Sequence, residues 1–278
     1  MTRPMSRLVP RPRFGLRIRG SRALVTGASG GIGQAIARAL AAEGVELVLS
    51  GRRLDVLEPL AAELGATVVA ADLSDLDQVG QLMEQAGEID ILVANAALPA
   101  SGALLEYSRG QILRNLAVNI EAPILMARNA GEAMVARGRG HIVMIGSVAG
   151  KVASGNAAMY NATKFGLRGF ALGFRQDLAP LGVGMSLVEP GFVRDAGMFA
   201  ESGGQLPAGV RTVSPDDVAT KVVSAIRRNR AEVVVAPIEL RAGVAVGSIF
   251  PTLSARLQRL GGADKVTASM IDGQRTKR

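Results

Sequence analysis

RALVTGASGGIGQAIARALAAEG, residues 22–44, decides how this chain folds. Its first five residues predict a short buried strand, the glycines at 27–33 predict a tight turn, and the residues from Gln34 predict a helix that ends at Gly44. A glycine turn lets the backbone approach a phosphate group, and the helix N-terminus adds N–H donors and a positive dipole. The stretch therefore predicts a dinucleotide-phosphate site, with a tight turn that binds nothing as the alternative.

The same alternation of strands and helices continues to residue 236. Further strand patterns lie at 45–50, 67–71, 89–94, 142–145, 183–189 and 232–236, and helical patterns include 54–64, 109–137 and 214–230. Strands that alternate with helices form parallel sheets covered on both faces. We expect an α/β fold with a doubly wound parallel sheet of about seven strands. No repeat or second core pattern appears, so we expect one domain over 22–240, a basic arm over 1–21 and an extension over 241–278.

The composition excludes several kinds of site. The chain has no cysteine, which excludes disulfides, cysteine nucleophiles and thiolate metal sites. A single histidine, His141, excludes a histidine metal cluster and leaves little room for a Ser-His-Asp triad, and we expect it to be structural. Residues 1–22 hold seven of the 32 basic residues and no acid, which leaves 25 basic against 24 acidic residues elsewhere, a net charge of +1. The fold itself is therefore not expected to bind nucleic acid.

Residues 141–170 carry the candidate chemistry. An apolar strand ends just before Ser147, and the helical pattern that follows carries Tyr160 and Lys164 one turn apart on one face. A phenol has a pKa near about 10, and a neighbouring ammonium group should lower it. Phenol, ammonium and hydroxyl together predict a proton-transfer site for an alcohol or carbonyl oxygen. Taken alone, a Tyr-x-x-x-Lys pair is more often two side chains with packed stems and solvated tips.

The second strand ends in SGRR, residues 50–53, where dinucleotide folds usually carry an acidic residue for the ribose hydroxyls. Guanidinium groups suit a 2′-phosphate instead, so NADP is favoured over NAD, with Arg52 as the first candidate and Arg53 as the second. Two solvated arginines at a helix start are the alternative. Asp72, after the third strand, is expected either to bind the adenine amine or to cap the next helix.

Two features concern the middle of the chain. Asn95 and Ala96 follow the fourth strand, and such small residues leave room for a cofactor ribose. Asn119 lies inside the long helical pattern, and Pro123 four residues later should free the carbonyl of residue 119. A locally opened helix at Asn119 can hold a water for a proton relay, and a simple kink is the alternative.

The remaining segments are less regular. The arginine-rich residues 1–21 predict a disordered arm, with attraction to anionic surfaces as a minor alternative. The glycine-rich residues 192–213 suit a lid over the site. The apolar residues 242–253 are too short to span a bilayer. We expect a packed extension there, with a membrane-surface or subunit-contact segment as the alternative. The last dozen residues are expected to be disordered.

Over roughly residues 22–240 the chain resembles the single-domain type of short-chain dehydrogenase/reductase. The matching motifs are TGASGGIG (26–33), Asp72, NAA (95–97), Asn119, Ser147, YNATK (160–164) and PG (190–191). The resemblance implies a Rossmann-type fold with NAD(P) as the hydride carrier. It implies that Tyr160 is the general acid/base and that Lys164 lowers its pKa and holds the nicotinamide ribose. Ser147 would polarise the substrate oxygen, and Asn119 would support a water relay.

The resemblance also places the ligands. The expected cofactor-binding residues are Gly27, Ser29, Gly31, Ile32, Gly33, Arg52, Arg53, Asp72, Leu73, Asn95, Ala96, Tyr160, Lys164, Pro190, Gly191 and Val193. The expected substrate residues are Leu98, Val148, Met159 and Phe192, with Met198 and Phe199 as further pocket candidates. No threonine follows the PG motif in PGFVRDAGM, so the contact to the nicotinamide amide stays unassigned.

These observations predict a cytoplasmic, NADP-dependent oxidoreductase that interconverts a ketone or aldehyde and an alcohol. The apolar pocket candidates favour an apolar small-molecule substrate, and no metal is expected. The resemblance implies a homodimer or homotetramer. The alternative is an NADP-binding sensor or scaffold protein without turnover, which would have no need of the Tyr160 and Lys164 pair.

Overall fold

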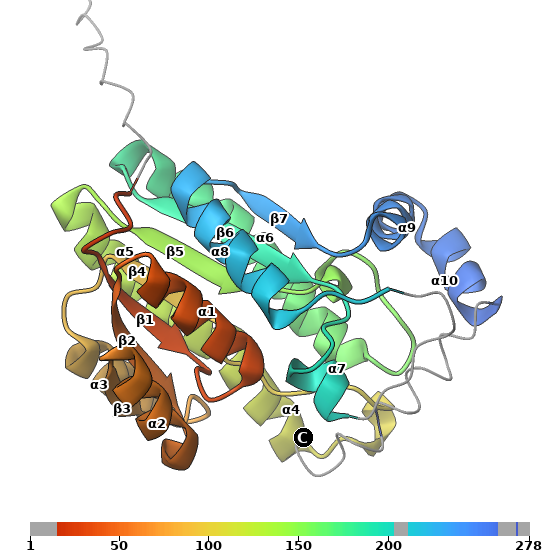
Figure 1. The fold of residues 1–278 in the computed structure, drawn as a ribbon. Helices are drawn as coiled ribbons and strands as arrows, with labels where there is room; N and C mark the ends of the chain where they lie inside the picture. Colours follow the sequence, from red (N-terminus) through yellow and green to blue (C-terminus); the bar gives the residue numbers. More distant parts are fainter. Residues whose placement is uncertain (1–15, 203–210, 261–270, 272–278) are drawn as a thin grey trace, which may run out of the picture.

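Seven parallel strands form one sheet in a computed structural model that describes residues 16–202, 211–260 and 271 (Figure 1). The strands are β1 (Arg22–Thr26), β2 (Glu46–Gly51), β3 (Thr67–Ala70), β4 (Ile91–Ala94), β5 (His141–Ile145), β6 (Gly184–Pro190) and β7 (Glu232–Val235). Their spatial order is β3-β2-β1-β4-β5-β6-β7, so the chain reverses its direction of travel between β1 and β4. The expected doubly wound, Rossmann-type sheet is confirmed, and its strand limits differ from the expected ones by at most two residues, at the start of β4.

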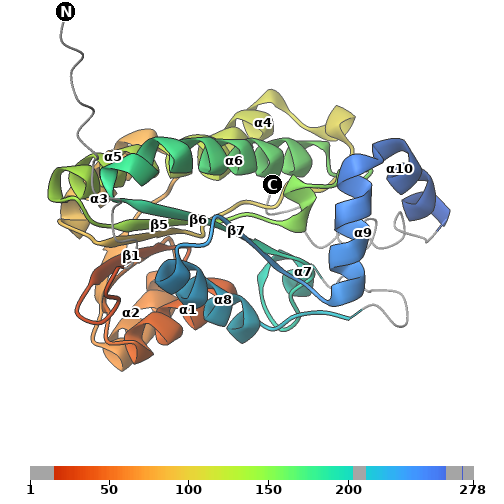
Figure 2. The same cartoon turned by 90° about the horizontal axis from the view of Figure 1, so that it is seen from above.

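Helices cover both faces of the sheet, as Figure 2 shows. One face carries α1 (Gly31–Ala42), α2 (Leu54–Leu64) and α8 (Pro215–Arg228), and the other carries α3 (Leu76–Ala86), α5 (Ala122–Arg137) and α6 (Ala158–Leu178). Shorter helices are α4 (Arg109–Leu116) and α7 (Gly197–Glu201), and two terminal helices follow β7, α9 (Ile238–Ile249) and α10 (Pro251–Leu260). The expected boundary between residues 240 and 241 thus falls inside α9.

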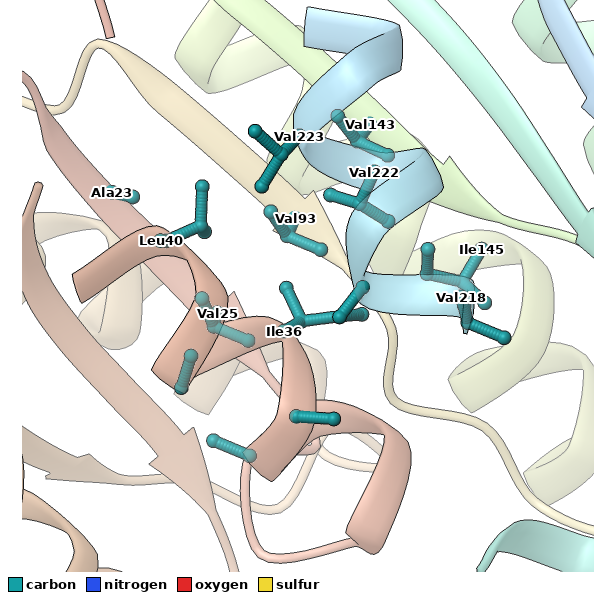
Figure 3. Packing of buried hydrophobic residues seen from close by; sticks show 14 of the residues in the cluster. Ala23, Val25, Ile36, Leu40, Val93, Val143, Ile145, Val218, Val222 and Val223 are labelled. Atoms are coloured by element: carbon teal, nitrogen blue, oxygen red, sulfur yellow. The ribbon is translucent and has the colours of Figure 1, made fainter. Parts of the chain in front are cut away.

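The core is built from aliphatic and alanine side chains because the chain has only 3% aromatic residues. Ile36 and Leu40 of α1 face the α8 valines over the centre of the sheet (Figure 3). On β1, Val25 faces this cluster and Leu24 faces the cluster on the opposite side, and both are fully buried. Burial on both faces explains why the strands read as continuous apolar runs.

The long helical pattern over 109–137 is interrupted in the structure. α4 ends at Leu116, a π-helical turn covers Ala117–Glu121, and α5 begins at Ala122. Within the turn, the N–H of Ala122 donates to the carbonyl of Ala117, five residues back. Pro123 has no N–H to give to the carbonyl of residue 119, and its ring would clash with that carbonyl. The local opening expected at Asn119 is therefore present, as a widened helical turn rather than a simple kink.

Candidate active site

The carboxyl ends of β1, β2, β3 and β4 border a cleft of about 490 Å³. This is the edge at which open parallel sheets bind ligands, where neighbouring chain connections run in opposite directions. The residues that line it are Gly27, Ser29, Gly30, Gly31, Ile32, Gly33, Ser50, Gly51, Arg52, Arg53, Ala71, Asp72, Leu73, Asn95, Ala96, Ala97, Leu98, Pro99, Arg114, Val118, Gly197 and Met198. The cleft therefore brings together the expected cofactor residues from the glycine turn, the Arg pair, Asp72-Leu73 and Asn95-Ala96.

The glycine turn is shaped by close packing of backbone against backbone. Gly27 has a φ of +64°, and a Cβ on it would lie 2.8 Å from the Cα of Ala96. A Cβ on Gly33 would lie 2.3 Å from the carbonyl oxygen of Gly27. Helix α1 starts directly after the turn, with no side-chain cap and no acidic residue in its first turn. Its first N–H groups are therefore available to an anion in the cleft.

Asn95 supports the turn from the neighbouring strand. Its Nδ2 donates to the carbonyls of Thr26 (3.0 Å) and Gly27 (3.2 Å), and its own N–H donates to the Thr26 hydroxyl (3.1 Å). The side-chain amide of Asn95 is thus committed to the backbone, although the residue borders the cleft as expected. Thr26, the first residue of the TGASGGIG motif, contributes to this arrangement, a role that its place in the motif did not indicate.

The arginine end of the cleft contains an ion pair. Arg52 Nη1 lies 3.8 Å from Asp72 Oδ2, and Arg53 donates to the carbonyl of Ser29. Burial opposes ionisation of Asp72, but hydrogen bonds from Ser74 and the charges of Arg52 and Arg114 together lower its pKa below the ordinary value. The N-cap of α3 is Asp75, so the capping role considered for Asp72 is wrong.

The proton-transfer residues lie at the end of β5 and on α6. Ser147 and Tyr160 share a hydrogen bond between their hydroxyl groups. The buried Lys164 donates from Nζ to the carbonyl of Ile145 at 3.1 Å, and Nζ lies 5.8 Å from the centroid of the Tyr160 ring. Burial lowers the pKa of Lys164 to about 8. The structure therefore brings Ser147, Tyr160 and Lys164 together, as expected from the sequence.

The expected lowering of the Tyr160 pKa does not occur in this arrangement. Burial raises the pKa of Tyr160, and the hydrogen bond to Ser147 only partly opposes that effect. The ammonium group of Lys164 donates to the Ile145 carbonyl and not to the phenol oxygen, and its charge does not offset the effect of burial. Loss of hydration outweighs the neighbouring polar groups, and the phenol holds its proton at neutral pH.

Asn119 fastens the loop after β4. Its Oδ1 accepts from the N–H of Leu98 at 2.7 Å, and its Nδ2 donates to the carbonyl of Leu98 and to Asn115 Oδ1, both at 3.0 Å. These contacts place Leu98 on the wall of the cleft. The side-chain amide therefore holds this loop, and the water relay at Asn119 stays a prediction.

Several expected ligand residues do not line this cleft. Met159 is buried against Ala100 and Tyr107, and Val193 is buried in the core beside α8. Phe192 contacts the ring of Phe199, with ring centroids 5.2 Å apart. Val148, Pro190 and Gly191 lie at the ends of β5 and β6, and Tyr160 and Lys164 lie on α6; none of these five residues lines the cleft. The side chains of Met159 and Val193 are both buried, and the substrate role of Met159 and the cofactor role of Val193 stay predictions.

The cleft also contains residues that the sequence analysis missed. Arg114 of α4, whose charge acts on Asp72, and Val118 of the π-helical turn also line it. They are one helical turn apart and precede Asn119, so the spacing around Asn119 was a signal that could have identified them. His141, the only histidine, lies outside the cleft. It is buried 2.9 Å from Ser186 Oγ, and burial lowers its pKa to about 3, which fits the expected structural role.

Four charged side chains, from the segment after Ser147, α6, β6 and β7, form a cluster. Lys151 Nζ lies 2.7 Å from Glu232 and 3.3 Å from Glu189, and Arg168 Nε lies 2.6 Å and 3.8 Å from the same carboxylates. Glu189 is fully buried, and burial together with Glu232 raises its pKa to about 7 against the opposing effects of Lys151 and Arg168. The cluster joins the segment after Ser147 to α6, β6 and β7.

Comparison with known proteins shows to which family the chain belongs. The model of the short chain dehydrogenase family matches residues 21–206. The ketoacyl reductase HetN of Nostoc is 36% identical over 256 residues, covering 86% of this chain and 88% of HetN. A dehydrogenase/reductase SDR family protein 7-like of Anopheles gambiae is 32% identical, covering 85% of this chain and 81% of that protein.

Solved structures agree with the fold. A metagenomic short-chain oxidoreductase in complex with NADP superposes with a TM-score of 0.68 at 33% identity, covering 80% of this chain and 99% of that one. A short-chain dehydrogenase from Sphingobium yanoikuyae in complex with NADPH gives a TM-score of 0.72 at 27% identity, covering 84% of this chain and 95% of that one.

Proposed function

This chain belongs to the short-chain dehydrogenase family, and from that premise we propose that it is an NADP-dependent oxidoreductase that interconverts a ketone or aldehyde and an alcohol. The observation that carries the proposal is the placement of Ser147, Tyr160 and Lys164 at the edge of the sheet that also holds the glycine turn. A bare oxidoreductase fold would not need a buried phenol beside a hydroxyl and an ammonium group there.

The cleft fits a dinucleotide. The glycine turn leaves no room for side chains, and the uncapped start of α1 offers N–H donors to phosphates. Arg52 and Arg53 would hold the 2′-phosphate of NADP, and Arg114 of α4 lines the same cleft. The NADP and NADPH complexes of the related structures support the same cofactor. When bound, the nicotinamide would supply or take up the hydride.

The side chains would handle the proton on the substrate oxygen. Tyr160, whose pKa is raised by burial, would hold a proton on Oη and donate it to a carbonyl oxygen. Ser147 would donate a hydrogen bond to the same oxygen and hold the carbonyl in place. Lys164, positioned by the Ile145 carbonyl, would supply positive charge beneath the phenol when that proton leaves. Because the phenol is protonated before substrate binds, the resting enzyme is prepared for carbonyl reduction.

The wall of the cleft favours an apolar substrate. Leu98, Pro99, Val118 and Met198 border it beyond the glycine turn. Because the Nostoc relative is named a ketoacyl reductase, acyl ketones are the first substrates to test. The test is a titration with NADPH and NADH, followed by a panel of ketones and aldehydes monitored by nicotinamide absorbance. NADPH binding with oxidation by some carbonyl compound is the expected result.

Replacement of the phenol separates an enzyme from a sensor. Tyr160→Phe removes the proton donor and leaves the cofactor cleft intact, so turnover should fall by about two to four orders of magnitude while NADPH affinity stays within a few fold. Steady-state kinetics and cofactor titration measure the two quantities. Equal turnover in the wild type and the variant would exclude Tyr160 as the acid. Cofactor binding with no turnover on a broad panel would favour the NADP sensor.

A further inference from the structure

The two terminal helices expose large apolar side chains. We call residues 238–260, which comprise α9 and α10, the C-terminal hairpin; Figures 1 and 2 both place it beyond the carboxyl end of β7. Seven of its apolar side chains are between 47% and 86% exposed: Ile238, Val246, Ile249, Phe250, Leu253, Leu257 and Leu260. Such a concentration marks an interaction surface, whereas single exposed apolar residues are ordinary.

Helix α10 has its polar side toward the protein. Gln258 Nε2 donates to the carbonyl of Ala153 at 3.1 Å and to the hydroxyl of Ser254 at 3.0 Å. Leu253, Leu257 and Leu260 follow the i, i+4, i+7 spacing of one helix face, and all three are exposed. A helix on a wetted surface has the opposite arrangement. The apolar face of α10 is therefore turned outward while the helix itself stays attached.

Helix α9 fixes the hairpin to the body of the protein. Val244 and Gly247 are buried, and a Cβ on Gly247 would lie 3.0 Å from Val152. Val152 follows Ser147 by five residues, so the hairpin lies beside the segment that carries the candidate active-site serine. The exposed apolar side chains are thus presented by an anchored element.

The charges of the hairpin indicate what covers it. Residues 240–260 contain Arg241, Arg256 and Arg259 and no acidic residue, and all three arginines are exposed. Glu239, at the start of α9, is paired with Arg211 at 2.8 Å. A two-fold contact between copies of this surface would bring arginines toward arginines with no carboxylate to pair them. An anionic surface with an apolar interior matches both properties.

We propose that the C-terminal hairpin binds the surface of an anionic lipid bilayer. Its apolar side chains would enter the boundary between headgroups and acyl chains, and its arginines would contact the headgroup phosphates and carboxylates. No helix in the described ranges is long and apolar enough to cross a membrane, so the contact is peripheral. The bound orientation would bring the proposed active site near the lipid; that consequence rests on the proposed function, whereas the lipid contact does not.

The experiment uses the full chain with phosphatidylcholine vesicles that contain or lack phosphatidylserine. Because the chain has no tryptophan, Phe250→Trp provides a single fluorescent reporter on the hairpin. We expect co-sedimentation and a blue-shifted emission with the anionic vesicles only. Leu257→Glu should lower vesicle partitioning about tenfold or more, because a buried apolar side chain is replaced by a charge. Arg256→Gln and Arg259→Gln should each lower it about fivefold.

Leu181→Glu is the matched control. Leu181 is 50% exposed and lies before β6, at the amino end of the sheet, far from the hairpin. This variant should bind vesicles like the wild type, and carbonyl turnover in detergent-free buffer should be unchanged in every variant. Unchanged binding in Leu257→Glu and in the arginine variants would overturn the proposal and assign vesicle binding to the Arg-rich residues 1–22. If the wild type does not bind vesicles and Leu257→Glu converts a dimer to a monomer, the proposal is wrong and the surface is an interface between two copies of the chain.

Discussion

At the scale of single residues, Arg52 is the candidate that decides between NADP and NAD. Arg52→Ala should weaken NADPH binding about 10- to 100-fold, the value of a hydrogen-bonded charge pair, and should change NADH binding little. Fluorescence titration with both cofactors measures the ratio. Arg114→Ala is the matched control, since Arg114 borders the same cleft and also acts on Asp72. A larger loss of NADPH preference in Arg114→Ala than in Arg52→Ala would mean that Arg114, and not Arg52, binds the 2′-phosphate.

Lys164 should set the alkaline limit of the reaction. Burial lowers its pKa to about 8, so the positive charge beneath Tyr160 is present below that pH and is lost above it. We expect kcat/KM for carbonyl reduction to fall as pH rises through about 8. In Lys164→Arg the guanidinium stays charged to a pKa above about 12, so residual activity should show no such fall. An identical alkaline limb in both proteins would mean that another group causes it.

At the scale of elements, the glycine turn that joins β1 to α1 has no space for a side chain at Gly33. Gly33→Ala places a methyl group 2.3 Å from the Gly27 carbonyl, and such overpacking should lower the free energy of unfolding by about 1–3 kcal/mol and weaken cofactor binding. Gly169→Ala in α6 is the control, because nothing lies within 4 Å of the added methyl group. That control should be neutral or stabilising by about 0.5–1 kcal/mol. Thermal unfolding with and without NADPH tests both.

The charged cluster that joins β6, β7 and α6 should make stability depend on pH. The folded-state pKa of Glu189 is raised to about 7 from the ordinary 4.5. Between pH 4.5 and pH 7, Glu189 is therefore protonated in the folded state and ionised in the unfolded state. The free energy of unfolding consequently decreases as pH rises through this range. Lys151, Arg168 and Glu232 face the same group.

Glu189→Gln removes this titration and keeps the shape of the side chain. Relative to the wild type, the variant should therefore be more stable at pH 8 than at pH 5, when unfolding is measured in urea at both pH values. Lys151→Met is the opposing case. It leaves the buried Glu189 and the half-buried Glu232 with one cation fewer and should destabilise the protein by about 3–5 kcal/mol. A pH-independent difference between Glu189→Gln and the wild type would contradict the assigned pKa.

At the scale of the whole molecule, the sheet order explains why distant segments meet. β1 and β4 are neighbours although α1, α2 and α3 separate them in the sequence, and the cleft lies at their carboxyl ends. The expected homodimer or homotetramer and the cytoplasmic location stay predictions, and gel filtration of the purified chain tests the first. Of the expected arm over 1–21, residues 1–15 lie outside the described residues, whereas Ile18 is buried in the core, so the predicted disorder is wrong there. Residues 203–210 of the expected lid and residues 261–270 and 272–278 of the extension also lie outside the described residues.

Local sequence determined the family, the parallel sheet and the grouping of Ser147 with Tyr160 and Lys164. Each of these follows from a short-range pattern: an apolar run, a glycine turn, or two residues one helical turn apart. Such patterns report the period and the burial of an element without knowledge of its neighbours. Arg52 and Arg53 were likewise found because they directly follow a strand whose carboxyl end must border the cleft.

Only the tertiary structure decided how these residues interact. The pKa of Tyr160 rises where the spacing predicted a fall, because burial depends on how much chain packs around the phenol and Lys164 bonds the Ile145 carbonyl. The side-chain amide of Asn119 bonds Leu98, twenty-one residues away in the sequence, and Met159 packs against Ala100 and Tyr107. The outward apolar face of α10 likewise needed the contact of Gln258 with Ala153 to be recognised. Burial and contact are properties of segments far apart in the sequence, so no local pattern contains them.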